Sequence, residues 1–406
     1  MTRPDVCLPI MNVACALGCN QETVWHRLYS EPESGLTPSD QYISDGTEAP
    51  VGRVPTGADE PEPLPEIPPG LSDFACRNNR LALKILDPIE QAVKQHIDAT
   101  DPGSFGIVVG TSTSGVEEAA DAIRNWKTDG AMTDAFHYHQ MEMGGLAEFL
   151  GRYLDVDGVR YTITTSCSSS AKVFAAAQAL IENGVCDTVL TGGVDALTKL
   201  TLNGFYSLQL ISSNQCNPFS VNRDGINIGE GGALFLMNEG TDGPMLLGSG
   251  ESSDAYQMNA PDPEGDGAYL SMSHALDEAG ITPEQVDYLN LHGTGTNQND
   301  AMEAKAVDRV FDRSVPCSST KPFTGHTLGG AGAVEAAICW MMINRHWHDL
   351  PLPPHLWDGE PDEELPHLDL VGTGEKVPVS NPVVMSNSFA FGGNNCSIIF
   401  GDPSDV

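Results

Sequence analysis

Short apolar runs alternate along the chain with longer amphipathic or alanine-rich stretches, a pattern typical of α/β proteins. Apolar side chains recur every fourth residue from Leu81 to Ile97, which predicts a helix with one buried face. Apolar and β-branched runs that end at glycine or polar residues predict strands over 104–110, 161–165, 188–191 and 231–237. Because alanine-rich stretches such as 168–183 separate these runs, we expect parallel sheets covered by helices.

The second half of the chain repeats this plan. Its expected elements are a strand over 286–291, a glycine-rich loop over 321–332, a helix over 333–344 and a strand over 396–400. The glycine-led segment 229–237 corresponds in pattern to 392–400, which predicts an internal duplication. We therefore divide the chain into two halves, 1–243 and 244–406. By contrast, 31–70 is rich in Pro, Glu and Gly and predicts an irregular surface region.

The charge of the chain is extreme, with 20 Lys and Arg against 56 Asp and Glu in 406 residues, a net charge of −36. This acidity argues against nucleic-acid binding, because phosphate recognition needs a positive surface. Adaptation to salt is one hypothesis. It would be abandoned if the unfolding midpoint were no higher in molar salt than in dilute buffer.

Cysteine usage and hydropathy indicate the compartment. Ten cysteines without a CxxC pair favour reduced thiols in a cytoplasmic protein over a zinc site or a disulfide framework. No apolar run approaches the roughly 20 residues that a membrane span requires. The apolar segment Val6–Cys19 is interpreted as a first buried strand rather than as a signal peptide.

The sharpest local feature is the segment Thr164–Ser170, TTSCSSS, which places Cys167 between an expected strand and an expected helix. A cysteine at a helix N-terminus lies near unpaired backbone N–H groups and the positive end of the helix dipole. Both favour the thiolate, which is the reactive form. From this motif alone, a buried structural cysteine with serines that only cap the helix stays an alternative.

Three further motifs place chemically useful side chains beside glycines. His292 opens HGTGT directly after a strand, on a loop that can approach a ligand closely. Lys321 and His326 lie in KPFTGH at the start of a helix, and Phe389 and Phe391 lie in NSFAFGG. A lone loop histidine carries little information. A cysteine of this kind together with two glycine-flanked histidines, each at the edge of an element, indicates a catalytic site.

Together the four motifs resemble the β-ketoacyl synthase family of the thiolase superfamily, in the family's order and over roughly Val6 to Gly401. His326 points to the elongating Cys-His-His class, since synthases that start from acyl-CoA use asparagine at this position. The resemblance implies a thiolase-like α/β fold in which two duplicated βαβ halves form a five-layered α-β-α-β-α sandwich. Three residues depart from the usual family pattern: Ser166 and Gly330 in place of alanine, and Ala390 in place of glycine.

The resemblance also implies a reaction, the decarboxylative condensation of an acyl-enzyme thioester with malonyl-acyl carrier protein. The pathway is either fatty acid synthesis or a specialised one, such as that of aryl polyene or polyketide-like lipids. Cys167 would be the nucleophile, and the backbone N–H groups of Cys167 and Phe391 would hold the oxyanion. His292 and His326 would stabilise the enolate, Lys321 would fix the environment of the histidines, and Phe391 would act as a gate.

Other candidate residues receive lesser roles. Glu303 either pairs with Lys321 or is a solvated helix residue, and Phe389 is expected to support its loop. Three acids are interpreted as structural: Asp224, Glu230 and Asp300. His137 and His139 could form a metal pair, but no third ligand is evident. No metal or bound cofactor is expected, because decarboxylation itself generates the carbanion and the substrates are carried on phosphopantetheine.

The expected partner is acyl carrier protein, with the chain as a homodimer or as a heterodimer with a paralogue that resembles a chain-length factor. By family analogy, 132–145 would lie at the subunit interface near the acyl pocket. Because carrier proteins are acidic, docking requires a basic patch formed by residues such as Arg124, Lys127 or Arg223, or screening by salt. Three alternatives stay open: a catalytically silent partner subunit, an acyltransferase or thioester hydrolase that uses the same cysteine, and a scaffold without chemistry.

Overall fold

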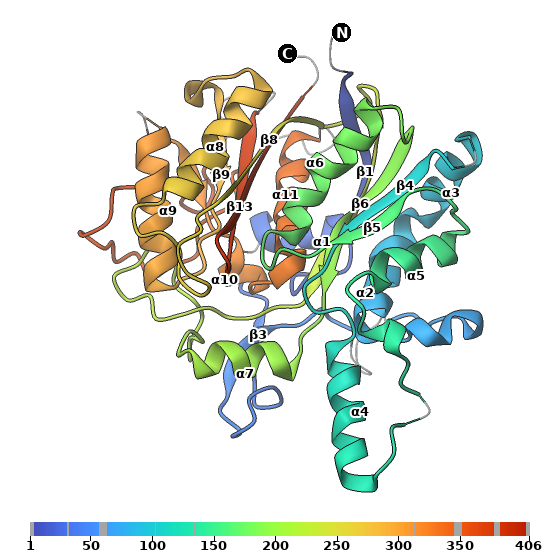
Figure 1. The fold of residues 1–406 in the computed structure, drawn as a ribbon. Helices are drawn as coiled ribbons and strands as arrows, with labels where there is room; N and C mark the ends of the chain where they lie inside the picture. The colour runs from blue at the N-terminus through green and yellow to red at the C-terminus, as the bar shows by residue number, and fades with distance from the viewer. Residues whose placement is uncertain are drawn as a thin grey trace.

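The computed structural model describes residues 4–30, 32–56, 63–101, 103–133, 135–311, 314–344, 351–376 and 382–402. Within this part of the chain, eleven strands form one mixed sheet in the order β11-β10-β9-β12-β13-β8-β1-β7-β6-β4-β5 (Figure 1). The strands of the first half are β1 (Val6–Ala14), β4 (Phe105–Gly110), β5 (Arg160–Ile163), β6 (Thr188–Asp195) and β7 (Gly231–Glu239). Those of the second half are β8 (Met245–Ser253), β9 (Tyr288–Asn290), β10 (Pro316–Ser318), β11 (Asp369–Leu370), β12 (Val384–Ala390) and β13 (Asn394–Gly401).

The two halves use the same strand topology. The first half has five strands in the sheet, in the order β5-β4-β6-β7-β1, which are the third, second, fourth, fifth and first along the chain. With the two-residue edge strand β11 left aside, the second half has the same order, β10-β9-β12-β13-β8. The two halves meet where β1 pairs with β8 at Cys7 and Met245. The repeat confirms the predicted duplication, whereas the division into two domains after residue 243 stays a prediction.

The sheet is mixed, so the prediction of parallel sheets is only partly right. In each half the first three strands of the sheet order are parallel, β5-β4-β6 and β10-β9-β12, and the last two pairings are antiparallel. Strands such as β6 are buried on both faces. A continuous apolar run therefore shows that the strand is central, and it carries no information about the direction of its neighbours.

Helices form three layers around the two halves of the sheet (Figure 1). The outer layers contain α2 (Arg77–Leu86) and α5 (Gly145–Leu154) on one side, and α8 (Asp266–Ala279) and α9 (Asn297–Val310) on the other. Between the halves lie α6 (Ser169–Glu182) and α11 (Ala331–Ile343), which contact strands of both. Every residue of α11 is buried, because this helix has a strand layer on each side. The order of layers agrees with the predicted five-layered sandwich.

The predicted helix over 81–97 is two helices, α2 and α3 (Glu90–Ala99), separated by a short turn at Asp87–Ile89. Pro88 explains the break, because proline lacks the N–H that a continuous helix would require. The predicted irregular region 31–70 contains a small hairpin, β2 (Leu36–Ser39) with β3 (Ala49–Gly52), and its residues 31 and 57–62 lie outside the described part of the chain.

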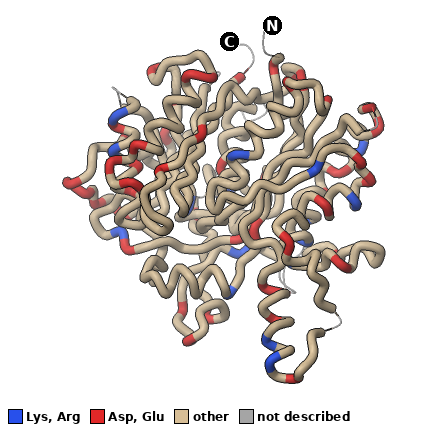
Figure 2. The backbone as a smooth tube through the Cα atoms, viewed as in Figure 1, with Lys and Arg blue, Asp and Glu red and all other residues tan. Residues whose placement is uncertain are grey.

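The remaining helices lie at the ends of the sheet: α1 (Gln21–Trp25), α4 (Val116–Asp129), α7 (Lys199–Ser207) and α10 (Lys321–Thr324). Figure 1 shows α4 extending away from the body of the molecule. Figure 2 shows Asp and Glu scattered over the outer helices and loops, with fewer Lys and Arg among them. Of the helices that the structure describes, none combines the length and the apolar character needed to cross a bilayer.

Candidate active site

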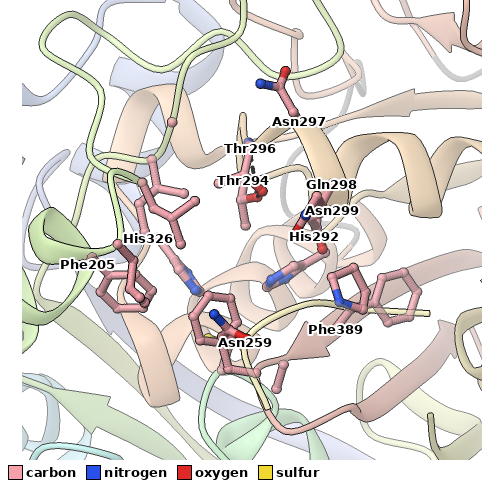
Figure 3. A pocket seen from close by; sticks show the side chains of 18 of the residues that line it. Phe205, Asn259, His292, Thr294, Thr296, Asn297, Gln298, Asn299, His326 and Phe389 are labelled. Carbon is pink, nitrogen blue, oxygen red and sulfur yellow. Dashed lines mark hydrogen bonds between the residues drawn. The ribbon is translucent and has the colours of Figure 1, made fainter. Parts of the chain in front are cut away.

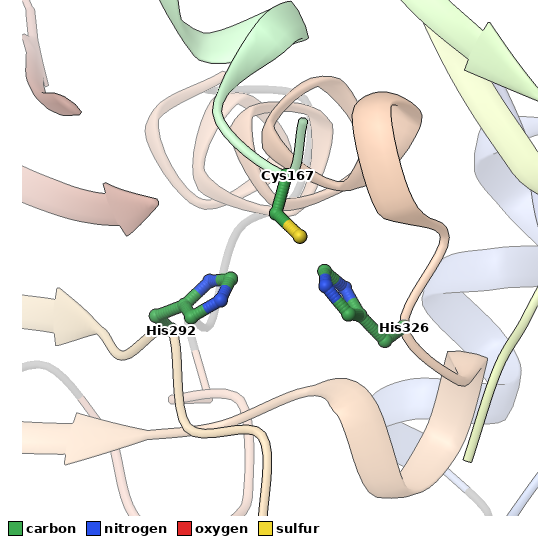
Figure 4. Close-up of side chains that lie close together, drawn as sticks. All are labelled: Cys167, His292 and His326. Carbon is green, nitrogen blue, oxygen red and sulfur yellow. The ribbon is translucent and has the colours of Figure 1, made fainter. Parts of the chain in front are cut away.

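The three predicted catalytic side chains converge from distant parts of the chain. Cys167 lies between β5 and α6, His292 directly follows β9, and His326 follows α10. Figure 4 shows the Cys167 sulfur directed into the space between the two imidazoles. One ligand atom of each, the sulfur and one ring nitrogen of each histidine, lies within 4.8 Å of the other two. All three side chains are buried, so this is an enclosed reaction centre.

Local backbone strain presents Cys167 to the pocket. Ser166 has a φ of 56°, a left-handed conformation that costs a non-glycine residue about 1–3 kcal/mol. Ser169 stabilises this bend, since its backbone N–H and its hydroxyl both donate to the carbonyl of Ser166, at 3.1 and 2.6 Å. Ser168 donates to the carbonyl of Thr165 at 3.0 Å. The serines of the motif therefore hold the turn before α6 in the shape that directs the thiol toward the two imidazoles.

The expected low thiol pKa at Cys167 is wrong for the resting protein. Burial raises the pKa of Cys167 to about 12, although the charge of Lys321 and the backbone N–H of Phe391 act in the opposite direction. Desolvation is the largest cause because segments from distant parts of the chain bury the thiol, which the sequence motif does not disclose. The thiol of Cys167 is therefore neutral at rest, and as the predicted nucleophile it would have to lose its proton on attack.

Alkylation of Cys167 by iodoacetamide is expected to accelerate about tenfold per pH unit from pH 7 to pH 10, because only the thiolate reacts. An ordinary cysteine would level off above about pH 8.5. The measurement is the alkylation rate of the Cys167 peptide by mass spectrometry, beside a free cysteine peptide as control. A plateau below pH 8 would show that the thiolate is already formed in the resting protein.

Both histidines are neutral in this environment. Burial, followed by the charge of Lys321, holds the pKa of His292 and of His326 well below the usual range. Each neutral imidazole has one N–H donor and one acceptor nitrogen. Within the described residues, neither ring nitrogen of His326 has a hydrogen-bond partner, although both are buried. The ring of His326 is thus available to a substrate.

The loop of His292 is anchored by Glu303, which corrects the expected pairing of Glu303 with Lys321. Glu303 is fully buried and accepts the backbone N–H groups of His292 and Gly293, both at 2.7 Å. Burial raises the pKa of Glu303 to about 7. Gly293 has a φ of 38°, and a Cβ there would lie 2.5 Å from the Cβ of Ser319, so only glycine fits this turn.

Lys321 pairs instead with Glu335, a residue that the sequence reasoning missed. The ammonium of Lys321 contacts the carboxylate of Glu335, donates to the carbonyl of His292 and lies 3.4 Å from His292 Nδ1. Glu335 could have been noticed as the one charged residue in the otherwise apolar AGAVEAAICWMMI of α11. The predicted role of Lys321 in the environment of the histidines agrees with these contacts.

Replacing Lys321 with methionine is expected to lower the free energy of unfolding by about 3–5 kcal/mol, because it leaves the buried carboxylate of Glu335 without its cation. Chemical denaturation measures the change. The matched control is Lys172→Met, which breaks a 2.8 Å pair with Glu251, whose side chain is 44% exposed. Breaking a pair of this kind costs about 0–1 kcal/mol. Equal losses in the two variants would contradict the prediction.

A pocket of about 350 Å³ leads to the three catalytic side chains. Figure 3 shows His292 and His326 directed into it, with Phe389 beside His292. The ring of Phe389 lies 6.1 Å from that of His292, and Phe391 packs against Phe205 with centroids 5.3 Å apart. Phe391 is half-buried and lines the pocket. Its role as a gate stays a prediction.

The acids interpreted as structural differ in their surroundings. Asp300 is buried and accepts the backbone N–H groups of Phe219 and Gly295, at 2.8 and 3.2 Å. Glu230 is buried and bonds to Arg77. Asp224, in contrast, is exposed and lines the pocket wall. Asp300 and Glu230 therefore have structural contacts, whereas Asp224 faces the path of a substrate.

Two of the residues considered for metal binding or docking, His139 and Arg223, have local contacts. His139 Nδ1 lies 2.7 Å from Glu142, and the potential metal-binding group found in the described part of the chain is Cys167 with His292 and His326. Arg223 is only 9% exposed and pairs with Asp362 at 2.6 Å. Arg223 is therefore not available for an exposed basic patch, which corrects its proposed role in docking.

The fold and its buried Cys-His-His cluster define a thiolase-like α/β protein. Residues 77–242 match the family model of the β-ketoacyl synthase N-terminal domain, and 245–353 match that of the C-terminal domain. The chain therefore belongs to the β-ketoacyl synthase family, as the four sequence motifs indicated.

The chain is similar to several curated proteins and solved structures. It is 35% identical over 263 residues to 3-oxoacyl-[acyl-carrier-protein] synthase 2 of Coxiella burnetii, a match over 60% of this chain and 62% of the relative. It matches a chain of the complex of the ketosynthase ApeO with its chain length factor ApeC from Xenorhabdus doucetiae, with a TM-score of 0.92, 39% identity and 98% coverage of both chains. The ishigamide ketosynthase/chain length factor matches with a TM-score of 0.86 and 25% identity, over 99% of this chain and 100% of that one.

Proposed function

We propose that the protein is a β-ketoacyl-[acyl-carrier-protein] synthase that condenses an acyl-enzyme thioester with malonyl-acyl carrier protein. One observation carries the proposal: a buried thiol and two neutral imidazoles lie within 4.8 Å of one another at the end of a pocket. A thiol alone would serve acyl transfer or hydrolysis. The second imidazole supplies the additional N–H donor that decarboxylative condensation requires.

In the first half-reaction, Cys167 Sγ attacks the carbonyl carbon of the acyl thioester and its proton passes to a neutral imidazole. The new C–S bond forms while the bond to the pantetheine sulfur breaks, and the proton leaves with the released thiol. The backbone N–H groups of Cys167 and Phe391 both act on the Cys167 sulfur and lower its pKa, so they point into the region where an oxyanion would form. Removing one such donor costs about 3–4 kcal/mol of transition-state stabilisation.

In the second half-reaction, malonyl-carrier loses CO₂ and its Cα–carboxylate electron pair forms an enolate. His292 and His326 donate N–H hydrogen bonds to the developing enolate oxygen, since each neutral ring retains one N–H donor. The enolate carbon then attacks the acyl carbonyl and expels the Cys167 thiolate. Lys321 positions His292 through the backbone carbonyl and Nδ1 of that histidine.

A specialised lipid or polyene pathway is favoured over housekeeping elongation. The match to the ApeO–ApeC complex extends over 98% of the chain at 39% identity, whereas the match to 3-oxoacyl-[acyl-carrier-protein] synthase 2 of Coxiella burnetii covers 60% at 35%. We propose a subunit partner of the chain-length-factor type, or a second copy, and carriage of the substrates on phosphopantetheine. Exposed Met132, Tyr138 and Met143 support a subunit interface along 132–145. A cytoplasmic location and the absence of a metal or bound cofactor are part of the same proposal.

The test combines the purified protein with an acyl-carrier thioester and malonyl-carrier, and measures CO₂ and the 3-oxoacyl product by mass spectrometry. The proposal expects an acyl adduct on the protein, followed by an elongated product with one CO₂ released per condensation. Free fatty acid without CO₂ would favour a hydrolase. An absence of any adduct, alone and after co-expression with a paralogous subunit, would favour the silent-partner alternative.

A further inference from the structure

A buried carboxylate outside the predicted site, Asp195 at the end of β6, accepts hydrogen bonds from two loops at once. It is 0% exposed. Its Oδ1 accepts the hydroxyl of Thr111 at 2.5 Å and both the backbone N–H and the hydroxyl of Thr113, at 3.0 and 2.9 Å. Ser112 donates to it through its backbone N–H at 2.8 Å and through its hydroxyl. These three residues form the loop after β4.

The second loop joined to Asp195 is the one that carries His326. Asp195 Oδ2 accepts the backbone N–H of Gly329 at 2.6 Å, only three residues after that histidine. Ser112 Oγ lies 3.2 Å from the same N–H. All six donor groups around the carboxylate are N–H or O–H, so the ionised, acceptor-only form of Asp195 matches its surroundings. One carboxylate thus connects the first half of the fold to the catalytic loop of the second.

This connection matters because, among the described residues, the His326 ring packs edge-on against His292 but has no hydrogen bond that fixes its direction. Its ring nitrogens have no partner in the described residues, so the direction of the ring follows from its backbone. Before the ring, the backbone N–H of His326 donates to Asn227 at 2.7 Å. The carbonyl of His326 accepts the backbone N–H of Gly229 at 2.9 Å. Beyond that carbonyl, Leu328 adopts a φ of 50°, and the contact from Gly329 to Asp195 joins the following part of the loop to the first half.

Gly329 is shaped for this contact. A Cβ at Gly329 would lie 2.8 Å from Asp195 Oδ2 and 2.7 Å from the backbone nitrogen of Ser112. Both distances are too short for a carbon atom, so only glycine lets the N–H reach the carboxylate. Glycine at position 329 is therefore required for the hydrogen bond to Asp195.

We propose that Asp195 is a positioning residue that orients His326 toward the enolate of the second half-reaction. This inference rests on the proposed function. Asp195 acts on His326 through the backbone of Gly329 and makes no contact with the thiol, although its negative charge contributes to the raised pKa of Cys167. Gly329→Ala removes the contact and keeps that charge, so this variant separates the two effects. Loss of this bond is expected to move His326 away from the enolate oxygen while leaving the path of the acyl group to Cys167 unchanged. The consequence is a selective fall in malonyl decarboxylation.

The test is the variant Asp195→Asn. Its amide NH₂ group cannot accept a hydrogen bond, so it repels one of the N–H or O–H donors that now bind the carboxylate. Decarboxylation of malonyl-carrier is expected to fall about 10–100-fold, the usual effect of removing a group that orients a reactive one. Acylation of Cys167, followed by intact mass, is expected to change less than about threefold. Gly329→Ala should reproduce this selective loss, and it carries the test if Asp195→Asn does not fold. The matched control is Glu118→Gln, which alters a half-buried carboxylate that accepts a backbone N–H from Arg77.

A second measurement does not depend on activity. Cd²⁺ alone is titrated into each protein and followed by thiolate-to-metal absorption, because Cys167, His292 and His326 lie close enough to bind one ion. Asp195→Asn is expected to weaken Cd²⁺ about tenfold or more, and Glu118→Gln to leave it unchanged. Equal losses in both half-reactions, or unchanged Cd²⁺ affinity, would overturn the inference. If the wild type performs neither half-reaction, the proposed function fails, and the Cd²⁺ comparison still decides the role of Asp195.

Discussion

Replacing Cys167 with alanine is expected to abolish the acyl adduct and to lower condensation by about 10⁴-fold or more, because the covalent intermediate can no longer form. Decarboxylation of malonyl-carrier should persist, since His292 and His326 still stand around the pocket and the enolate does not require the thiol. This combination separates the proposed synthase from a hydrolase, in which all activity would depend on the cysteine. The measurements are intact mass, 3-oxoacyl product and CO₂ release on the same samples.

The control for Cys167→Ala is Cys339→Ala, which removes a buried thiol from α11 instead. Its adduct should stay on Cys167 with the wild-type mass shift. An adduct that survives in Cys167→Ala would assign the nucleophile to another cysteine. Loss of the adduct in both variants would indicate that unfolding, and not chemistry, explains the result.

Replacing His326 with alanine is expected to leave acylation of Cys167 largely intact and to lower malonyl decarboxylation about 10²–10³-fold. The physical reason is the loss of one preorganised N–H donor to the enolate oxygen, in a buried site where water does not compete. Single-turnover measurement of each half-reaction gives the two effects separately. The effect should exceed that of Asp195→Asn, since alanine removes the donor that Asp195 only orients.

The exposed His274→Ala serves as the control for His326→Ala, because it removes an imidazole from α8 without reaching the pocket. It should match the wild type in both half-reactions. If His326→Ala lost acylation and decarboxylation to the same extent, His326 would be acting on the thiol rather than on the enolate. The assignment of the two imidazoles would then have to change.

The local elements were largely predictable from the sequence. The alanine-rich helix expected over 168–183 is α6 at Ser169–Glu182, and the strand expected over 104–110 is β4 at Phe105–Gly110. Both depend on side-chain periodicity and on glycine or serine at the ends, which act within a few residues. Pro88 divides the helix expected over 81–97, a local signal that the periodicity alone concealed.

The candidate catalytic side chains were also identified from local sequence signals. Cys167, His292 and His326 were found because each lies at the edge of an element beside glycine or serine. The family comparisons agree with the resemblance that these motifs indicated. The roles assigned to the individual residues stay predictions that the experiments above test.

Only the tertiary structure decided which groups face one another and what burial does to them. The cation of Lys321 meets Glu335, 14 residues later in the chain, rather than Glu303. Asp195 joins a loop that lies 134 residues away in sequence. The pKa of Cys167 rises although a helix begins beside it, because desolvation depends on every segment packed around the thiol. The sequence by itself therefore determined the helices and strands and the identity of the reactive side chains. Long-range packing determined which groups those side chains contact, their protonation and their orientation.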